Sequence, residues 1–111
     1  MKVAVIGCGG YVGSYVTRAL VARGHDVRGS VRDASPERTG WIVEKAAAGA
    51  GDRFQLIEAD VFDQASIVRA MSGCDGTIVC AGSPKIEPET IPLMAAVAGN
   101  CCDAAQETGV R

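Results

Sequence analysis

Apolar and polar positions along this chain follow two alternating periods. Residues 2–6 (KVAVI) form a continuous apolar run rich in β-branched side chains, which is typical of a parallel strand covered on both faces. Residues 11–23 place apolar side chains at the spacing of one helical face, and Gly24 supplies the stop. The chain is therefore predicted to begin with a strand, a glycine-rich turn and a helix.

The same alternation continues to the end of the chain. Further strands are predicted at 27–31, 54–58 and 76–82, and helices at 36–49, 63–73 and 90–108. The first of these helices is predicted to be interrupted by Gly40, and the second to have Asp63 as its N-cap. The last helix is predicted to bury one stripe, which comprises Ile91, Met94, Ala95, Ala98, Cys101, Cys102 and Ala105.

Strands that alternate with helices predict an α/β fold built from βαβ units. We expect a Rossmann-type parallel sheet with helices on both faces, strand order 3-2-1-4, truncated before a fifth strand. With 111 residues the chain is expected to form one domain, residues 1–111.

Composition narrows the classes of partner. A formal net charge of −2 with scattered basic residues argues against nucleic acid. No apolar run approaches the roughly 20 residues of a membrane span, and no signal peptide precedes the first strand, so no membrane partner and a cytoplasmic location are expected. The five cysteines lack C-x-x-C spacing, which predicts packing thiols and no metal site.

Glycines at 7, 9, 10 and 13 follow the first strand directly. A strand, a glycine-rich turn and a helix N-terminus present unpaired N–H groups and a positive dipole end, which suit a pyrophosphate. Gly7 would permit the tight turn, Gly9 and Gly10 the close approach of the backbone to phosphate, and Gly13 the packing of helix on sheet. A dinucleotide is therefore predicted to bind here, with Tyr11 and Val12 at the start of the helix among the binding residues.

The end of the second strand bears on which dinucleotide is bound. NAD-preferring sites typically hold a carboxylate there, but by register this position falls at Val31, followed by Arg32. A guanidinium suits the extra phosphate of NADP, and Arg38 lies close enough in sequence to add positive charge. Arg28 could either add further positive charge or be a solvated arginine at the edge of its strand. We therefore favour NADP over NAD, although a shift of register would make Asp33 a ribose ligand and reverse the preference.

Two later segments also end at the carboxyl edge of the sheet. Asp60 follows the third strand, where it could reach the adenine or could instead cap its own loop. Residues 80–84 (CAGSP) follow the fourth strand with small side chains, where the nicotinamide half is expected to pass.

These motifs resemble the extended short-chain dehydrogenases/reductases, in particular the branch of dihydroflavonol reductase and cinnamoyl-CoA reductase. The resemblance lies in GCGGYVGSYVTRALVARGHDVRGSVRD, in residues 59–63 and 73–77, and in residues 81–84. Residues 35–52 match this branch poorly. The resemblance implies pyrophosphate binding by Gly7, Gly10 and Gly13, a 2′-phosphate on Arg32 and more weakly on Arg38, adenine at Asp60 and Val61, and nicotinamide ribose at Ala81 and Gly82.

The resemblance also implies where the chemistry lies. In this family a catalytic Ser and a Tyr-x-x-x-Lys pair follow the segment that this chain contains, and neither Tyr11 nor Tyr15 is followed by such a lysine. The chain is expected to be the NADP(H)-binding N-terminal half of a longer reductase of a small-molecule carbonyl substrate, inactive alone and able to self-associate through the exposed edge of strand four.

The sequence is also compatible with two other functions. A non-catalytic NAD(P)-sensing regulatory domain similar to the NmrA-like regulators would need the pocket but neither Tyr nor Lys. A nucleotide-sugar epimerase would share the fold, but typically has an acidic residue where this chain has Val31.

Overall fold

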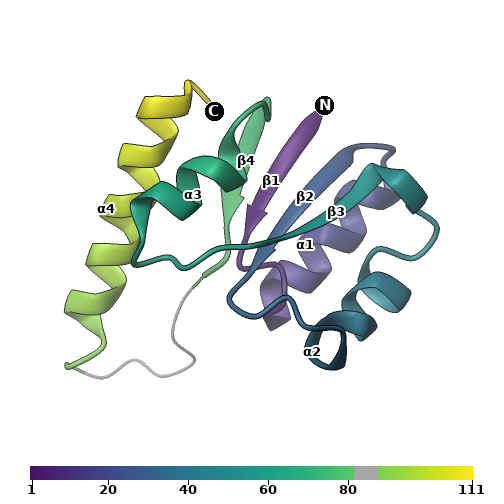
Figure 1. Ribbon diagram of the computed structural model, residues 1–111, viewed down its shortest axis with the longest axis horizontal. Helices are drawn as coiled ribbons and strands as arrows, with labels where there is room; N and C mark the ends of the chain where they lie inside the picture. The colour runs from purple at the N-terminus through teal and green to yellow at the C-terminus, as the bar shows by residue number, and fades with distance from the viewer. Residues whose placement is uncertain (82–87) are drawn as a thin grey trace.

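The computed structural model describes residues 1–81 and 88–111 and contains a four-stranded parallel sheet. The strands are β1 (Lys2–Ile6), β2 (Asp26–Val31), β3 (Phe54–Glu58) and β4 (Gly76–Val79), in the order β3-β2-β1-β4 (Figure 1). All three neighbouring pairs are parallel, with Val3 opposite Val27 and Gly76. The predicted Rossmann-type sheet and its strand order are confirmed.

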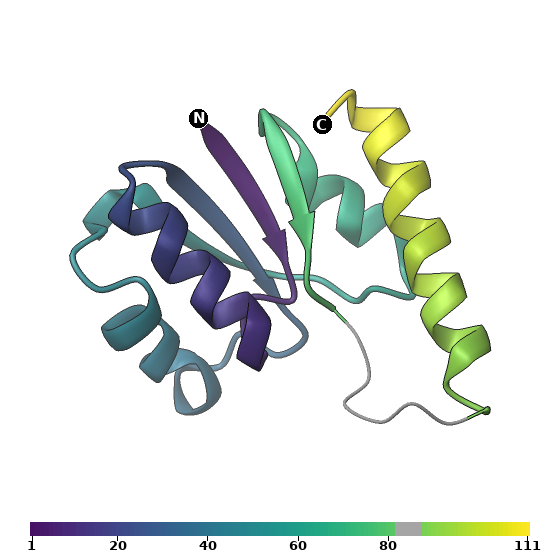
Figure 2. The same ribbon diagram turned by 180° about the vertical axis from the view of Figure 1, so that it is seen from behind.

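Helices cover both faces of this sheet. On one face lie α1 (Tyr11–Ala22), α2 (Pro36–Trp41) and the π-helical turn η1 (Ile42–Ala46), and on the other lie α3 (Gln64–Met71) and α4 (Ile91–Thr108) (Figures 1 and 2). A short 3₁₀ turn, η2 (Gly51–Arg53), leads into β3. None of the helices in the described part of the chain has the length and apolar character that a membrane span requires.

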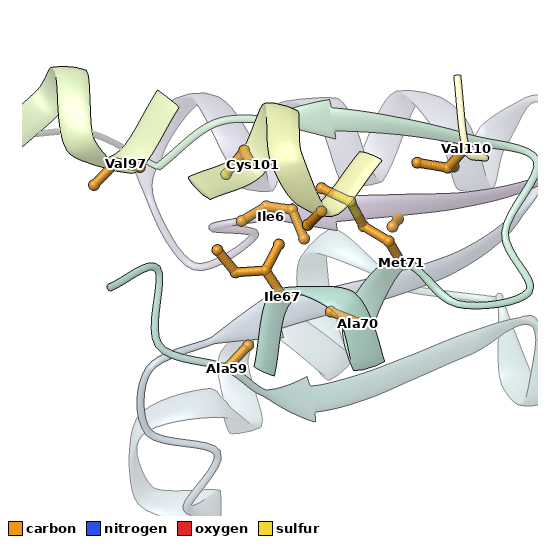
Figure 3. Packing of buried hydrophobic residues seen from close by; sticks show 10 residues of the cluster. Ile6, Ala59, Ile67, Ala70, Met71, Val97, Cys101 and Val110 are labelled. Carbon is orange, nitrogen blue, oxygen red and sulfur yellow. The ribbon is translucent and has the colours of Figure 1, made fainter. Parts of the chain in front are cut away.

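Alternation along β1 divides the core into two layers. Ala4 and Ile6 pack with α3 and α4, in a cluster that includes Ile67 and Met71 (Figure 3). Val5 lies in the opposite layer with α1, β2 and η1. Because successive side chains of a strand point to opposite faces, this central strand is buried on both sides.

Two predicted details are wrong. The helix that begins at Pro36 is not interrupted by Gly40 but passes through it, and its geometry changes at Ile42 instead. The stripe predicted on α4 is also displaced: its buried residues are Val97, Cys101 and Ala104, at i, i+4 and i+7, while Ile91, Met94 and Cys102 are exposed. This helix packs mainly against α3, so one narrow seam is buried rather than the broad apolar stripe that the sequence suggests.

Candidate functional site

The turn after β1 lies between the carboxyl ends of β2 and β4. The backbone N–H groups of Gly7 and Cys8 donate hydrogen bonds to the carbonyl oxygen of Ser30, at 3.2 and 3.0 Å, and Gly7 N–H also donates to Ser30 Oγ at 3.2 Å. Gly7 has a φ of +85°, and a Cβ there would lie 2.8 Å from the backbone nitrogen of Ala81. Glycine is therefore required at this position, both for its conformation and for its contact with the segment after β4.

The other two glycines of the motif differ in their surroundings. A Cβ on Gly13 would overlap the carbonyl oxygen of Gly7, so Gly13 allows α1 to pack on the turn and does not line a cavity. Gly10 is the N-cap of α1, offers no side-chain cap, and would place a Cβ no closer than 3.9 Å to its nearest neighbour. The N-terminus of α1 therefore keeps room beside Gly10 for an anion.

A cavity of about 400 Å³ opens at this edge of the sheet. It brings together six of the residues predicted from sequence, from all four strand ends: Gly7, Gly10, Arg32, Asp60, Val61 and Ala81. Tyr11 and Val12, on the first turn of α1, do not line it, and both side chains are exposed. Gly82 lies outside the described residues.

The loop after β3 forms one wall of this larger cavity. Asp60 accepts a hydrogen bond from Phe62 N–H on Oδ1 at 2.9 Å, and its own N–H and C=O are both bonded to Ser66 Oγ. Asn100 on α4 donates its side-chain N–H to the carbonyl oxygen of Val61 at 3.0 Å. Asp60 thus caps its own loop, as one of the two interpretations of the sequence predicts, and it also lines the larger cavity.

Apolar residues that the sequence reasoning missed complete the larger cavity. Phe62 lines it from the loop after β3, and Leu93, Met94 and Val97 line it from the first turns of α4. Leu93 was a signal for this wall, because it is an apolar residue near the start of the last helix that the predicted core stripe does not include. An apolar wall opposite polar strand ends suits a flat aromatic ring with a polar edge.

A smaller cavity of about 200 Å³ adjoins the first on the α2 side of β2. Val31 and Arg32 line both cavities, and Gly9, Asp33, Arg38 and Trp41 line the smaller one. Arg38 Nε lies 3.3 Å from Asp33 Oδ2, and Asp33 Oδ1 accepts a hydrogen bond from Ser35 N–H at 2.9 Å. Hydrogen bonds from Ser35 lower the pKa of the Asp33 carboxyl, and the positive charge of Arg38 lowers it to a smaller extent.

Arg28 takes no part in either cavity. Its Nη1 donates to the carbonyl oxygens of Ala70 and Ser72 at 3.1 and 2.6 Å, at the end of α3. The sequence predicted either a cofactor contact or a solvated arginine, and neither prediction describes a donor to the carbonyl groups at the end of α3.

Cys8 in the turn is completely buried. Burial raises the pKa of its thiol to about 12, so the thiol stays protonated at neutral pH and does not act as a nucleophile. Across residues 1–81 and 88–111, no group of His, Cys, Asp and Glu side chains is arranged to hold a metal ion.

Comparisons with known proteins agree with this geometry. The family model described as NAD(P)H-binding matches residues 7–111. Cinnamoyl-CoA reductase 1 of Oryza sativa subsp. japonica is 38% identical over 109 residues, which cover 98% of this chain and 32% of that protein. Tetraketide alpha-pyrone reductase 1 of Arabidopsis thaliana is 34% identical over 94 residues, 82% of this chain and 27% of that protein.

A solved structure shares the fold. The UDP-glucose-4-epimerase of Stenotrophomonas maltophila superposes with a TM-score of 0.80 at 24% identity, over 100% of this chain and 35% of that one. The chain thus spans about a third of the length of the relatives it matches. The predicted resemblance to cinnamoyl-CoA reductases is confirmed, and the chain belongs to the family of NAD(P)H-binding domains.

Proposed function

We propose that this chain binds NADP(H) and is the cofactor-binding part of a reductase that transfers hydride to the carbonyl group of a small-molecule substrate. The observation that carries the proposal is the glycine-rich turn at the N-terminus of α1, opening onto a cavity lined by the ends of all four strands. In open α/β sheets, dinucleotides bind at this edge.

The pyrophosphate is assigned to the first turn of α1. Gly10 leaves the approach free of side chains, and no acidic residue lies in the first turn of this helix. The N–H groups of Tyr11, Val12 and Gly13 belong to that turn, so these residues would act through their backbone rather than their side chains.

The adenosine is assigned to the junction of the two cavities. Asp60 and Val61 line the larger cavity with Phe62, where the adenine ring would lie against apolar side chains. Arg32 lines both cavities and Arg38 the smaller one, so a 2′-phosphate on the ribose would meet two guanidinium groups. This arrangement supports NADP over NAD.

The nicotinamide ribose is assigned to the segment after β4, with Ala81 on the larger cavity and Gly82 next to it in sequence. Bound NADPH supplies the hydride, and the residues of this chain bind and orient the cofactor. We expect the 111-residue chain alone to bind NADPH without reducing carbonyl substrates.

Titration of the chain with NADPH and NADH tests the proposal. Trp41 is the only tryptophan and lines the smaller cavity, so its emission provides the signal. Saturable binding that is tighter for NADPH is expected. Gly10→Ala should fold, because its Cβ would meet only the carbonyl oxygen of Gly7, at an ordinary contact distance of 3.9 Å, but it should weaken binding by more than about tenfold by blocking the phosphate.

Gly99→Ala is the matched control. Gly99 lies on α4, outside both cavities, and a Cβ there meets nothing within 4 Å. Unchanged affinity is expected for this variant. Failure of the wild-type chain to bind either nucleotide, or equal binding by Gly10→Ala and the wild type, would contradict the proposed site.

A further inference from the structure

The smaller cavity holds opposed charges. Arg32, Asp33 and Arg38 all line it, and Asp33 and Arg38 form an ion pair with Nε and Oδ2 3.3 Å apart. Both side chains are largely exposed, at 52% for Asp33 and 76% for Arg38. A carboxylate therefore lines the cavity to which the proposed function assigns a 2′-phosphate.

Asp33 is held at this place by the backbone. Its Oδ1 accepts the N–H of Ser35 at 2.9 Å, while Oδ2 is left to contact Arg38. Ser35 is the N-cap residue of α2, and Arg38 lies in the same short helix. Asp33 and Arg38 thus belong to adjoining parts of one turn, and the hydrogen bonds from Ser35 lower the pKa of the Asp33 carboxyl.

We propose that Asp33 is a specificity-determining residue that competes with the 2′-phosphate for Arg38 and so limits the preference for NADP over NAD. The inference rests on the proposed binding of NADP(H). A phosphate monoester carries about −1.5 to −2 charges near neutral pH and is repelled by a carboxylate in the same cavity. NADP binding requires Arg38 to exchange Asp33 for the phosphate, whereas NAD has no phosphate and requires no exchange.

The Asp33→Asn variant isolates the charge. The amide oxygen can still accept the Ser35 N–H, so the turn before α2 is retained while the negative charge is lost. The affinity for NADPH and for 2′,5′-ADP is expected to rise about three- to fivefold, in the range of exposed ion pairs. The affinity for NADH should change by less than about twofold, and added salt should reduce the gain for NADPH.

Glu37→Gln is the matched control, because it removes the same charge from the first turn of α2 at a residue that lines neither cavity. It is expected to change the affinity for NADPH by less than about twofold, since a charge outside the cavity is screened by solvent. Asp33→Ser, whose hydroxyl can also accept the Ser35 N–H, should reproduce the gain of Asp33→Asn. Far-ultraviolet circular dichroism confirms that each variant is folded.

The role of Arg38 is tested in the Arg38→Gln background, where Asp33→Asn should give a clearly smaller gain. An equal gain there would overturn competition for Arg38, and so would an unchanged affinity for NADPH in the Asp33→Asn single variant. Loss of NADH affinity with NADPH unaffected would show instead that Asp33 binds the ribose. A wild-type chain that binds no nucleotide contradicts the proposed function itself, a result distinct from any of these.

Discussion

At the scale of single residues, the turn after β1 depends on a glycine in the neighbouring strand. Cys8 is completely buried, and a Cβ on Gly29 of β2 would lie 2.6 Å from its Sγ and 3.0 Å from its Cβ. Gly29 therefore leaves the space that Cys8 fills. Ser30, the next residue, accepts the N–H groups of Gly7 and Cys8, so the end of β2 both accommodates and orients the turn.

Gly29→Ala should destabilise the fold by about 1–3 kcal/mol, because the added methyl group overpacks a closed part of the core. Cys8→Ala removes the sulfur atom that lies closest to this methyl group. The double variant should therefore be more stable than the sum of the two single effects predicts, a coupling that urea unfolding measures. Strictly additive effects would contradict this packing.

The glycines around the turn show how much of the site could be predicted from the sequence. The spacing of Gly7, Gly10 and Gly13 predicts three roles, and the positive φ of Gly7 in the tight turn and the packing of Gly13 on that turn match two of them. The dependence on Gly29 could not be predicted, because it arises from a contact between segments 21 residues apart. No local pattern in the sequence encodes such a contact.

At the scale of elements, the short helix α3 is held at its end by a strand. Its last carbonyl groups have no partner within the helix, and Arg28 on β2 donates to those of Ala70 and Ser72. A cation at a helix C-terminus also interacts favourably with the helix dipole. Arg28 thus ties the α3 layer to the sheet.

Arg28→Met keeps much of the aliphatic side chain and removes these hydrogen bonds. A loss of about 1–2 kcal/mol in the free energy of unfolding is expected, since hydrogen bonds from a charged donor to the carbonyl groups are lost. The affinity for NADPH should be unchanged, because Arg28 lines neither cavity. Denaturant unfolding and nucleotide titration measure the two effects, with Arg18→Met on the exposed side of α1 as control. A weakened affinity for NADPH at full stability would restore Arg28 as a cofactor contact.

The sequence predicts elements better than it predicts their buried faces. β1 and β3 begin and end as predicted, and Asp63 caps α3 by accepting the N–H of Ala65. The buried face of α4 was mispredicted because nearly every turn of this helix carries small or apolar side chains, so its composition does not mark one face. Packing against α3 selects Val97, Cys101 and Ala104, while Leu93 and Met94 line the larger cavity.

At the scale of the whole molecule, β4 is an edge of the described sheet and is only partly covered. Thr77 N–H donates to the carbonyl oxygen of Arg111, and Arg111 N–H donates to that of Asp75, so the first part of this strand has a partner in its own chain. Further along, Ile78 and Val79 are 39% and 42% exposed. Ile78 pairs with Val5 in register and so lies on the α1 face of the sheet.

An exposed strand edge with apolar side chains favours pairing with a second chain, so the 111-residue chain is expected to self-associate through Ile78 and Val79. Sedimentation velocity should show a sedimentation coefficient that rises with concentration. Ile78→Lys should keep the chain monomeric, because a lysine on an edge strand opposes such pairing. Val43→Lys, at an exposed apolar residue on η1, should associate like the wild type. A wild-type chain that stays monomeric at every concentration, or association that persists in Ile78→Lys, would show that the edge is not the contact.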